Sequence, residues 1–269
     1  MRIWHQSVAD LSGQPEYHAK LEEHVRAVAS ETVTVDLHGL PPGSYGSYTT
    51  TDVLGSPFLY HMLYRQVIDY ARQAESEGYD AFVVGSYSEP FVREMRAVVD
   101  IPVVTIGESC MLVACSLGKK QALISSVPAV ARIVDDHVDA YGLRSRVSTV
   151  CSVGPMMDEL KFNAGWTNPQ DILDRFTDLA IGAVQDGADV IVPAEAVLSE
   201  LLRTNDITSI GGAPVLDTVG VTWRYAEMMV SLWEKTGLRV GRAWEYARPD
   251  ADLIGHFVGH STAGATSPS

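Results

Sequence analysis

The chain has 269 residues, of which 46% are hydrophobic and 20% charged, enough for two domains with sizeable cores. Its 34 acidic and 20 basic residues give a formal net charge of −14, which argues against nucleic acid or an anionic membrane as the main partner. Three cysteines are too few for a disulfide framework, and neither a secretory signal nor a membrane-spanning apolar run is visible. We therefore expect a cytoplasmic protein.

Short apolar runs alternate with amphipathic stripes along almost the whole chain. The runs predicted to form strands are residues 33–37, 81–84, 103–106, 122–124, 147–151, 190–192 and 214–216. The stripes predicted to form helices are residues 17–28, 59–71, 130–138 and 172–183. Asn168 and Pro169 precede the last stripe as a predicted N-cap and first helical residue. Strands and helices that alternate at this pitch predict an α/β fold with parallel sheets.

Two segments of the chain resemble each other. Residues 77–86 and 186–195 each contain a helix-ending glycine, an aspartate, a buried strand and a polar residue at the carboxyl end of that strand. An X-Pro-Val strand follows each segment. We interpret the two segments as parts of two equivalent halves of the molecule. This predicts one lobe from residues 1–117 plus 218–258 and a second lobe from residues 118–217.

Two further segments have loop-like compositions. Residues 39–58 are rich in Gly, Pro, Ser, Thr and Tyr, and such a long loop inside an α/β half is uncommon unless it covers a site. We expect this segment either to fold over the mouth of a cleft or to pack on a neighbouring subunit. Residues 259–269 are small and polar, which predicts a flexible tail.

Polar residues at strand ends are the candidates for a functional site, because ligands of open parallel sheets bind beyond the carboxyl ends of the strands. Ser86 and Glu195 end equivalent strands of the two halves, so we expect them to face each other across one cleft. Such a pair suits the transfer of a proton at one carbon from two sides. Candidates for substrate binding at these strand ends are His5, Gln6, Ser7, Tyr87, Ser125 and Ser126.

The order and spacing of several motifs resemble the aspartate/glutamate/hydantoin racemase superfamily, and above all its hydantoin racemase branch. The motifs are Gly78–Pro90, Val99–Val104, Ile106–Ser109, Gly187–Val192 and Pro214–Asp217. The resemblance covers nearly the whole chain. It implies two flavodoxin-like lobes related by pseudo-two-fold symmetry, with the active site between them and with the N- and C-terminal segments in one lobe.

The sequence departs from that family at the positions that carry its chemistry. Members use two cysteines, one in each lobe, as the acid and base of proton transfer, and the resemblance puts these positions at Ser86 and Glu195. The usual Asn-Pro-Asn after the first strand is His5-Gln6-Ser7. A glutamate in an apolar cleft is an effective base, because desolvation moves its pKa toward neutrality. A serine hydroxyl is a poor base unless another group activates it.

Each candidate also has a structural explanation. Ser86 could satisfy the backbone of a tight turn, Glu195 could cap the helix that follows it, and His5 could be a hydrogen-bonded core residue. Cys110 lies near the start of a predicted helix, where the dipole could lower its thiol pKa, although a small buried cysteine fits the pattern too. Glu108 could cap that same helix. The histidines show no metal-binding spacing and no nucleotide-binding motif is present, so we expect neither metal nor cofactor.

The sequence therefore predicts a cofactor-independent isomerase that moves a proton at a carbon next to a carbonyl of a small carboxylate or a hydantoin-like cyclic amide. Glu195 would be the acid/base and Ser86 the hydroxyl on the opposite face. Donors that would hold the developing enolate oxygen are Gln6, Ser7, Ser125 and Ser126. Two alternatives stay open: a hydrolase or lyase of a cyclic amide or lactone that uses Glu195, and a non-catalytic small-ligand-binding protein. We expect a small-molecule substrate and a homo-oligomer.

Overall fold

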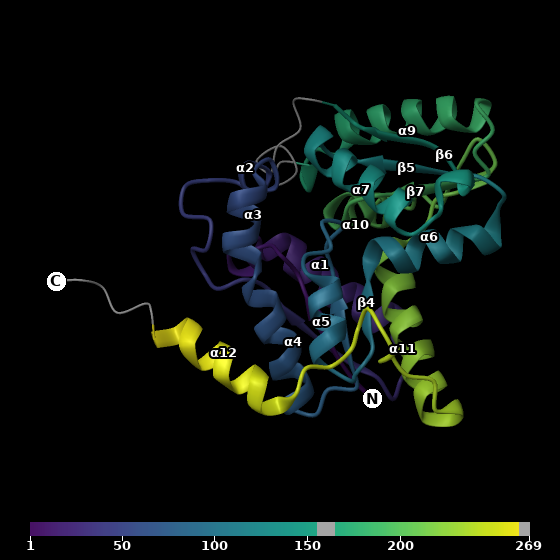
Figure 1. Cartoon of the computed structure of the whole chain (residues 1–269). Coiled ribbons are helices and arrows are strands. Elements are labelled where there is room, and N and C mark those ends of the chain that lie inside the picture. Colours follow the sequence, from purple (N-terminus) through teal and green to yellow (C-terminus); the bar gives the residue numbers. More distant parts are fainter. Residues whose placement is uncertain (155–164, 264–269) are drawn as a thin grey trace.

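The strands of the chain form two parallel sheets and a short antiparallel hairpin, as seen in a computed structural model that describes residues 1–154 and 165–263 (Figure 1). The first sheet has the order β2-β1-β3-β4, built from β1 (Arg2–Gln6), β2 (Thr34–His38), β3 (Ala81–Val84) and β4 (Val103–Thr105). The second has the order β6-β5-β7, built from β5 (Gln121–Ser125), β6 (Val147–Ser152) and β7 (Val190–Pro193). The hairpin joins β8 (Ser209–Ile210) and β9 (Ala213–Pro214). The predicted α/β fold with parallel sheets is confirmed.

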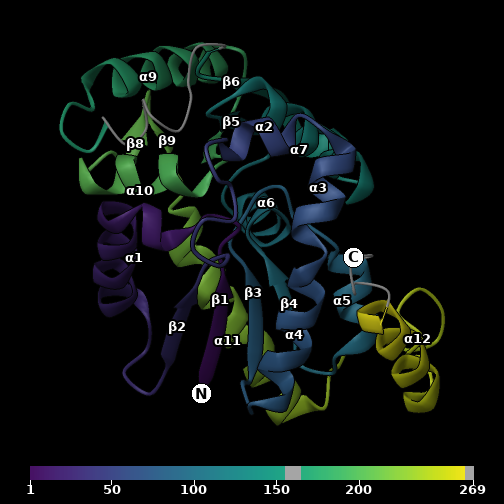
Figure 2. The ribbon, with the colours of Figure 1, turned by 90° about the vertical axis from the view of Figure 1, so that its left-hand side faces the viewer.

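Helices cover both faces of the sheets. The α-helices are α1 (Pro15–Val28), α2 (Thr50–Leu54), α3 (Pro57–Tyr64), α4 (Gln66–Ser76), α5 (Val92–Val98), α6 (Ile106–Leu117), α7 (Pro128–Ala140), α9 (Gln170–Gln185), α10 (Ala196–Thr204), α11 (Thr218–Thr236) and α12 (Ala251–Ala263). Two 3-10 turns, η1 (Leu11–Gly13) and η2 (Arg144–Arg146), complete the described elements. Figure 2 shows the two sheets one above the other, with α12 standing apart from both.

Strands β3, β4, β5 and β7 are buried along their whole length because both faces of the sheets are covered there, as is usual for parallel sheets. In β3 the alternating residues Phe82 and Val83 point to opposite faces and belong to different hydrophobic clusters. Helices α4 and α5 pack on one face of the first sheet, and α11 packs on the other. Helix α6 contacts β4 of the first sheet and β5 and β7 of the second, so the two sheets share one continuous hydrophobic core.

Helix α11 brings residues from late in the chain back to the first sheet. Its N-cap is Asp217, whose Oδ1 accepts a hydrogen bond from the Gly220 backbone at 3.0 Å. The helix contacts β3, β4 and α6, and its Trp223 is fully buried. The lobe boundaries inferred from the internal repeat stay a prediction.

The structure differs from the predicted elements at five places. The segment 39–58, predicted as a loop, contains α2 and the start of α3, because Thr49 forms a capping box with Asp52 and Pro57 follows the N-cap Ser56. The single helix predicted over residues 59–71 is two helices that meet at Arg65.

The other three differences lie in the second half of the chain. In the region predicted as strand 214–216, residues 213–214 pair antiparallel with β8, and Val215 makes an isolated parallel bridge to Ile191. Helix α9 starts one residue later than predicted, with Pro169 as its N-cap. Part of the predicted tail, residues 259–263, is helical within α12, and its last residues, 264–269, lie outside the described part of the chain.

Candidate functional site

A cavity of about 100 Å³ lies where the carboxyl ends of strands from both sheets meet. Four of the residues that line it lie one or two residues beyond the end of a strand: Ser7 after β1, Ser86 after β3, Ser126 after β5 and Glu195 after β7. The structure thus brings Ser86 and Glu195 from different sheets to the same cavity. Their chemical roles stay a prediction.

Helices and turns supply the rest of the cavity wall. Gln14 and Tyr17 reach it from the start of α1, and Val127 and Val130 from the start of α7. Thr50, Thr51 and Leu54 line it from α2, a helix that also contacts α7 of the second sheet. This part of the segment 39–58 therefore reaches across from the first sheet to the second at the cavity.

Ser86 lines the cavity from a turn that it also helps to hold. Its Oγ accepts a hydrogen bond from the Ser88 backbone N–H at 3.2 Å and is hydrogen-bonded to the Ser88 Oγ at 2.9 Å. The Ser88 carbonyl accepts a further hydrogen bond from the Tyr60 hydroxyl at 2.7 Å. Ser86 therefore stabilises a turn, as the sequence allowed, and it also lines the cavity.

The loop that carries Ser86 is anchored by Glu89, a buried residue in the left-handed backbone region with φ of 44°. Its Oε1 accepts hydrogen bonds from the backbone N–H groups of Gly107 at 2.7 Å and Glu108 at 3.0 Å, at the start of α6. Its Oε2 accepts a hydrogen bond from the Tyr141 hydroxyl and lies 3.4 Å from the His137 Nδ1. Since His137 and Tyr141 belong to α7 and its C-cap, Glu89 ties this loop to the second sheet.

Glu195 lines the opposite part of the cavity as the N-cap of α10. Its carboxylate accepts hydrogen bonds from the backbone N–H groups of Val197 at 3.3 Å and Leu198 at 3.2 Å. Both donors and the helix dipole favour a negative charge at this position. The capping role that the sequence allowed is present, and it fixes a carboxylate at the cavity.

Tyr17 adds a phenol to the cavity near Glu195. Burial, together with the neighbouring Glu200 and Glu195 carboxylates, raises the pKa of Tyr17 well above its usual value. Its hydroxyl therefore stays protonated and can donate a hydrogen bond.

His5 and Gln6 lie beneath the cavity and are not among the residues that line it. The His5 Nδ1 accepts a hydrogen bond from the Trp223 indole at 3.1 Å, and burial together with His38 lowers the pKa of His5 to about 3. Its ring is accommodated by Gly85, where a Cβ would lie 2.2 Å from the His5 Cε1. The Gln6 Oε1 accepts a hydrogen bond from the Trp4 indole at 3.0 Å, and its Nε2 donates to the Ser7 carbonyl at 2.8 Å.

The two serines after β5 take different positions. Ser126 lines the cavity, whereas Ser125 is fully buried and its Oγ donates to the Val127 carbonyl at 3.1 Å.

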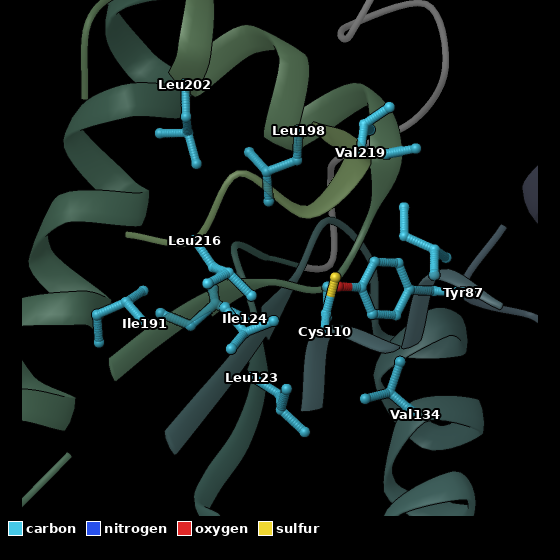
Figure 3. Close-up of a cluster of buried hydrophobic side chains, with 14 of the residues drawn as sticks. Tyr87, Cys110, Leu123, Ile124, Val134, Ile191, Leu198, Leu202, Leu216 and Val219 are labelled. Atoms are coloured by element: carbon cyan, nitrogen blue, oxygen red, sulfur yellow. The ribbon is translucent and has the colours of Figure 1, made fainter. Parts of the chain in front are cut away.

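Tyr87 also lines the cavity, and its hydroxyl points toward the Cys110 sulfur (Figure 3). Burial raises the pKa of Cys110 to about 12, so the thiol is not activated by the helix start; its Sγ donates to the Thr218 carbonyl at 3.2 Å.

A buried ionic cluster of His24, Glu200 and Asp217 lies beside the site, and no sequence pattern predicts it. The His24 Nδ1 contacts the Glu200 carboxylate, and its Nε2 lies 2.8 Å from the Asp217 Oδ2. Burial alone would lower the pKa of His24, but the hydrogen bonds to Asp217 and Glu200 raise it to about 9. The charged imidazole thus joins α1 to α10, which begins after Glu195, and to the cap of α11.

These missed residues differ in how far the sequence could have revealed them. Glu89 lies in the Gly78–Pro90 motif, but its partners on α6 and α7 follow only from the fold. Members of the cluster around His24 lie far apart in the chain, up to 193 residues for His24 and Asp217. Within residues 1–154 and 165–263, no group of three or more His, Cys, Asp or Glu side chains has an arrangement that could hold a metal ion.

Comparisons with known proteins agree on one family. A family model described as Asp/Glu/Hydantoin racemase matches residues 12–226. A hydantoin racemase from Pseudomonas sp. (strain NS671) is 30% identical over 171 residues, which cover 63% of this chain and 66% of that protein. A hydantoin racemase from Rhizobium meliloti is 27% identical over 180 residues, which cover 66% of this chain and 70% of that protein.

Solved structures show the same fold. The allantoin racemase from Klebsiella pneumoniae superposes with a TM-score of 0.73 at 20% identity, over 93% of this chain and 94% of that one. The allantoin racemase from Pseudomonas fluorescens superposes with a TM-score of 0.72 at 24% identity, over 93% and 97% of the two chains. None of the helices in the described part of this chain has the length and apolar content needed to cross a membrane.

Proposed function

Because the chain belongs to the Asp/Glu/hydantoin racemase family, we propose that it moves a proton at a carbon next to a carbonyl group of a small cyclic amide or carboxylate. The relatives and structural neighbours named above are hydantoin and allantoin racemases, which favours a cyclic amide. The observation that carries the proposal is that Ser86 and Glu195, at the ends of strands from different sheets, line one cavity. A substrate carbon between them would be open to proton transfer on both faces.

In this proposal, Glu195 is the base that removes the proton from the carbon. The N–H groups of Val197 and Leu198 hold its carboxylate in a fixed direction and favour the ionised form, which can accept a proton. Breaking the C–H bond leaves its electron pair on the substrate as an enolate. The reverse step returns the proton from the Glu195 carboxyl to the same face.

Ser86 serves the opposite face in the proposed reaction. Its hydroxyl gives a proton to the enolate carbon and regains one from solvent through the Ser88 hydroxyl, 2.9 Å away, while Glu195 releases to solvent the proton that it removed. The hydrogen bonds that the Ser86 hydroxyl makes among the described residues go to Ser88 rather than to a histidine or carboxylate. A serine without such a base is a weak nucleophile, so this arrangement favours proton transfer over acyl transfer.

Hydroxyl groups are the proposed donors to the enolate oxygen. The Ser7 Oγ accepts the Ala9 N–H at 3.1 Å, which leaves its own proton to donate. Ser126 and the protonated phenol of Tyr17 line the same cavity. Donors directed at a developing charge in a site that excludes water stabilise the transition state.

The test is a pair of isotope measurements on one enantiomer of a 5-substituted hydantoin. In D2O, we expect the optical rotation to be lost while deuterium appears at carbon 5. Polarimetry measures the rotation and NMR measures the deuterium. In water labelled with oxygen-18, we expect no labelled product. Ring-opened product that carries solvent oxygen would replace the proposal with a hydrolase, and binding without either change would support a ligand-binding protein.

A further inference from the structure

A second cavity, of about 400 Å³, lies at the open edge of the first sheet. It is bounded by β4, by α11 and by the segment 238–246, which runs past β4 before α12 begins (Figure 1). Its walls are largely apolar, with Ile101, Val104, Met229 and Trp233 among them. This volume is within the usual range for pockets that bind small organic molecules, and it exceeds that of the cavity at Ser86 and Glu195.

Among the described residues that line this second cavity, every charged side chain except one arginine has an oppositely charged partner. Arg96 pairs with Glu108, and its guanidinium also donates to the Val103 carbonyl at 3.0 and 3.2 Å. Asp100 accepts from Arg242 at 2.7 Å and also pairs with Arg248.

Arg239 is the exception. Its guanidinium carbon lies 4.8 Å from the centre of the Trp233 ring, and no carboxylate of the described residues lies within ion-pair distance of it. An unpaired positive charge therefore lies beside an aromatic ring in the wall of an apolar cavity. A guanidinium is well suited to hold a carboxylate through two parallel hydrogen bonds.

We propose that the second cavity binds a small planar aromatic carboxylate. The ring would lie among the apolar walls beside Trp233, and the carboxylate would pair with Arg239. An uncharged aromatic compound of the same shape would keep the apolar contacts but lose the ion pair.

The cavity is connected to the Ser86 loop through the first turn of α6. The Glu108 side chain lines the cavity, while the backbone N–H groups of Glu108 and Gly107 hold the Glu89 carboxylate. Glu89 in turn anchors the loop that carries Ser86. Because Glu108 lies in the cavity wall, a compound that fills the cavity would press on this turn, so we expect the ligand to change the turnover number. This regulatory part rests on the proposed racemase function, whereas the binding part does not.

The binding test uses 2-naphthoate and its neutral analogue 2-naphthamide in isothermal titration calorimetry with the full chain. We expect 2-naphthoate to bind about tenfold more tightly, the effect of one charge-assisted interaction. Arg239→Gln should remove this preference, and Arg132→Gln, which changes an exposed arginine on α7, should keep it. Equal affinities for the two compounds, or no binding of 2-naphthoate at millimolar concentration, would overturn the proposal.

A cavity-filling variant locates the bound compound. Gly241 lines the cavity, and a Cβ there would have no heavy atom within 4 Å, so a larger side chain can start at this position without a backbone clash. Gly255 on α12 has equally free surroundings and is exposed, which makes Gly255→Leu the matched control. We expect Gly241→Leu alone to abolish binding, with thermal melts that match the wild type. Undiminished binding by the folded Gly241→Leu variant would contradict the assignment.

The regulatory part has its own measurement. The turnover number for hydantoin racemisation should change at saturating 2-naphthoate in the wild type and in Gly255→Leu, and should stay constant in Gly241→Leu. A constant turnover number in the wild type with 2-naphthoate bound would overturn the coupling. If no hydantoin is turned over at all, the proposed function fails, and the calorimetry still decides whether the cavity binds the aromatic carboxylate.

Discussion

The ends of β3 and β7 come from similar sequence segments, yet the structure holds their polar residues in different ways. Glu195 is fixed locally, by the first N–H groups of the helix that it caps. Ser86 lies in a loop whose position depends on Glu89, and Glu89 depends on α6 and α7. One wall therefore presents a negative charge held by local backbone, and the other presents an uncharged hydroxyl held by distant contacts. We infer that the two faces of a substrate would meet groups of very different basicity.

The largest expected effect is that of Glu195→Gln, which removes the charge from the β7 wall. Loss of a positioned general base typically costs about 10²–10⁴ in rate, and we expect a loss of that size in the turnover number for racemisation. Glu195→Asp keeps a carboxylate and a good N-cap, so it should retain more activity than the glutamine variant. Solvent deuterium entering the substrate at the wild-type rate in Glu195→Gln would exclude Glu195 from the reaction.

The next effect separates the two walls directly. Ser86→Ala removes the hydroxyl from the β3 wall but leaves Glu195 able to exchange the proton on its own face. We expect inversion to fall by about 10²-fold, as for loss of a general acid, while deuterium uptake without inversion falls much less. Polarimetry and NMR on the same D2O reaction give both rates. Ser86→Cys, which restores a thiol of the family type, should recover inversion. An equal loss of exchange and inversion in Ser86→Ala would contradict the separate roles of the two walls.

A smaller effect is expected from the anchor of the β3 wall. Glu89→Gln keeps the shape of the side chain but weakens the charge-assisted hydrogen bonds to Gly107, Glu108 and Tyr141. Such bonds contribute about 1.5–3 kcal/mol each, so we expect a lower unfolding free energy and roughly a tenfold lower turnover number. Denaturant titration and steady-state kinetics measure the two quantities. Glu94→Gln, at an exposed position on α5, is the control, and wild-type behaviour of Glu89→Gln would show that the loop needs no anchor.

The sequence predicted the strand ends well because the rule for them, a short apolar run that ends in polar residues, depends only on local sequence. That rule placed Ser7, Ser86, Ser126 and Glu195 at one edge, and all four line the cavity. The rule could not predict which of the adjacent residues at a strand end line the cavity and which are buried. Ser125 is buried, and His5 packs against Trp223, which lies more than 200 residues later in the chain. The anchors Glu89 and His24 were missed for the same physical reason, since their partners are set by packing between helices.

The smallest expected effect on activity concerns the ionic cluster behind the β7 wall, and it is best seen as a pH dependence of stability. The folded pKa of His24 is raised to about 9 from an ordinary value of 6.5, because the charged ring is hydrogen-bonded to Asp217 and Glu200. The protonated ring therefore contributes stability that is complete below pH 6.5 and is lost as the pH rises through about 9. We expect the unfolding free energy, measured by denaturant titration, to fall over this range in the wild type. His24→Gln should be less stable at pH 6 and lack that part of the slope, whereas His18→Gln, on the exposed face of α1, should keep it. An unchanged slope in His24→Gln would show that another group titrates there, and that the β7 wall does not depend on a charged His24.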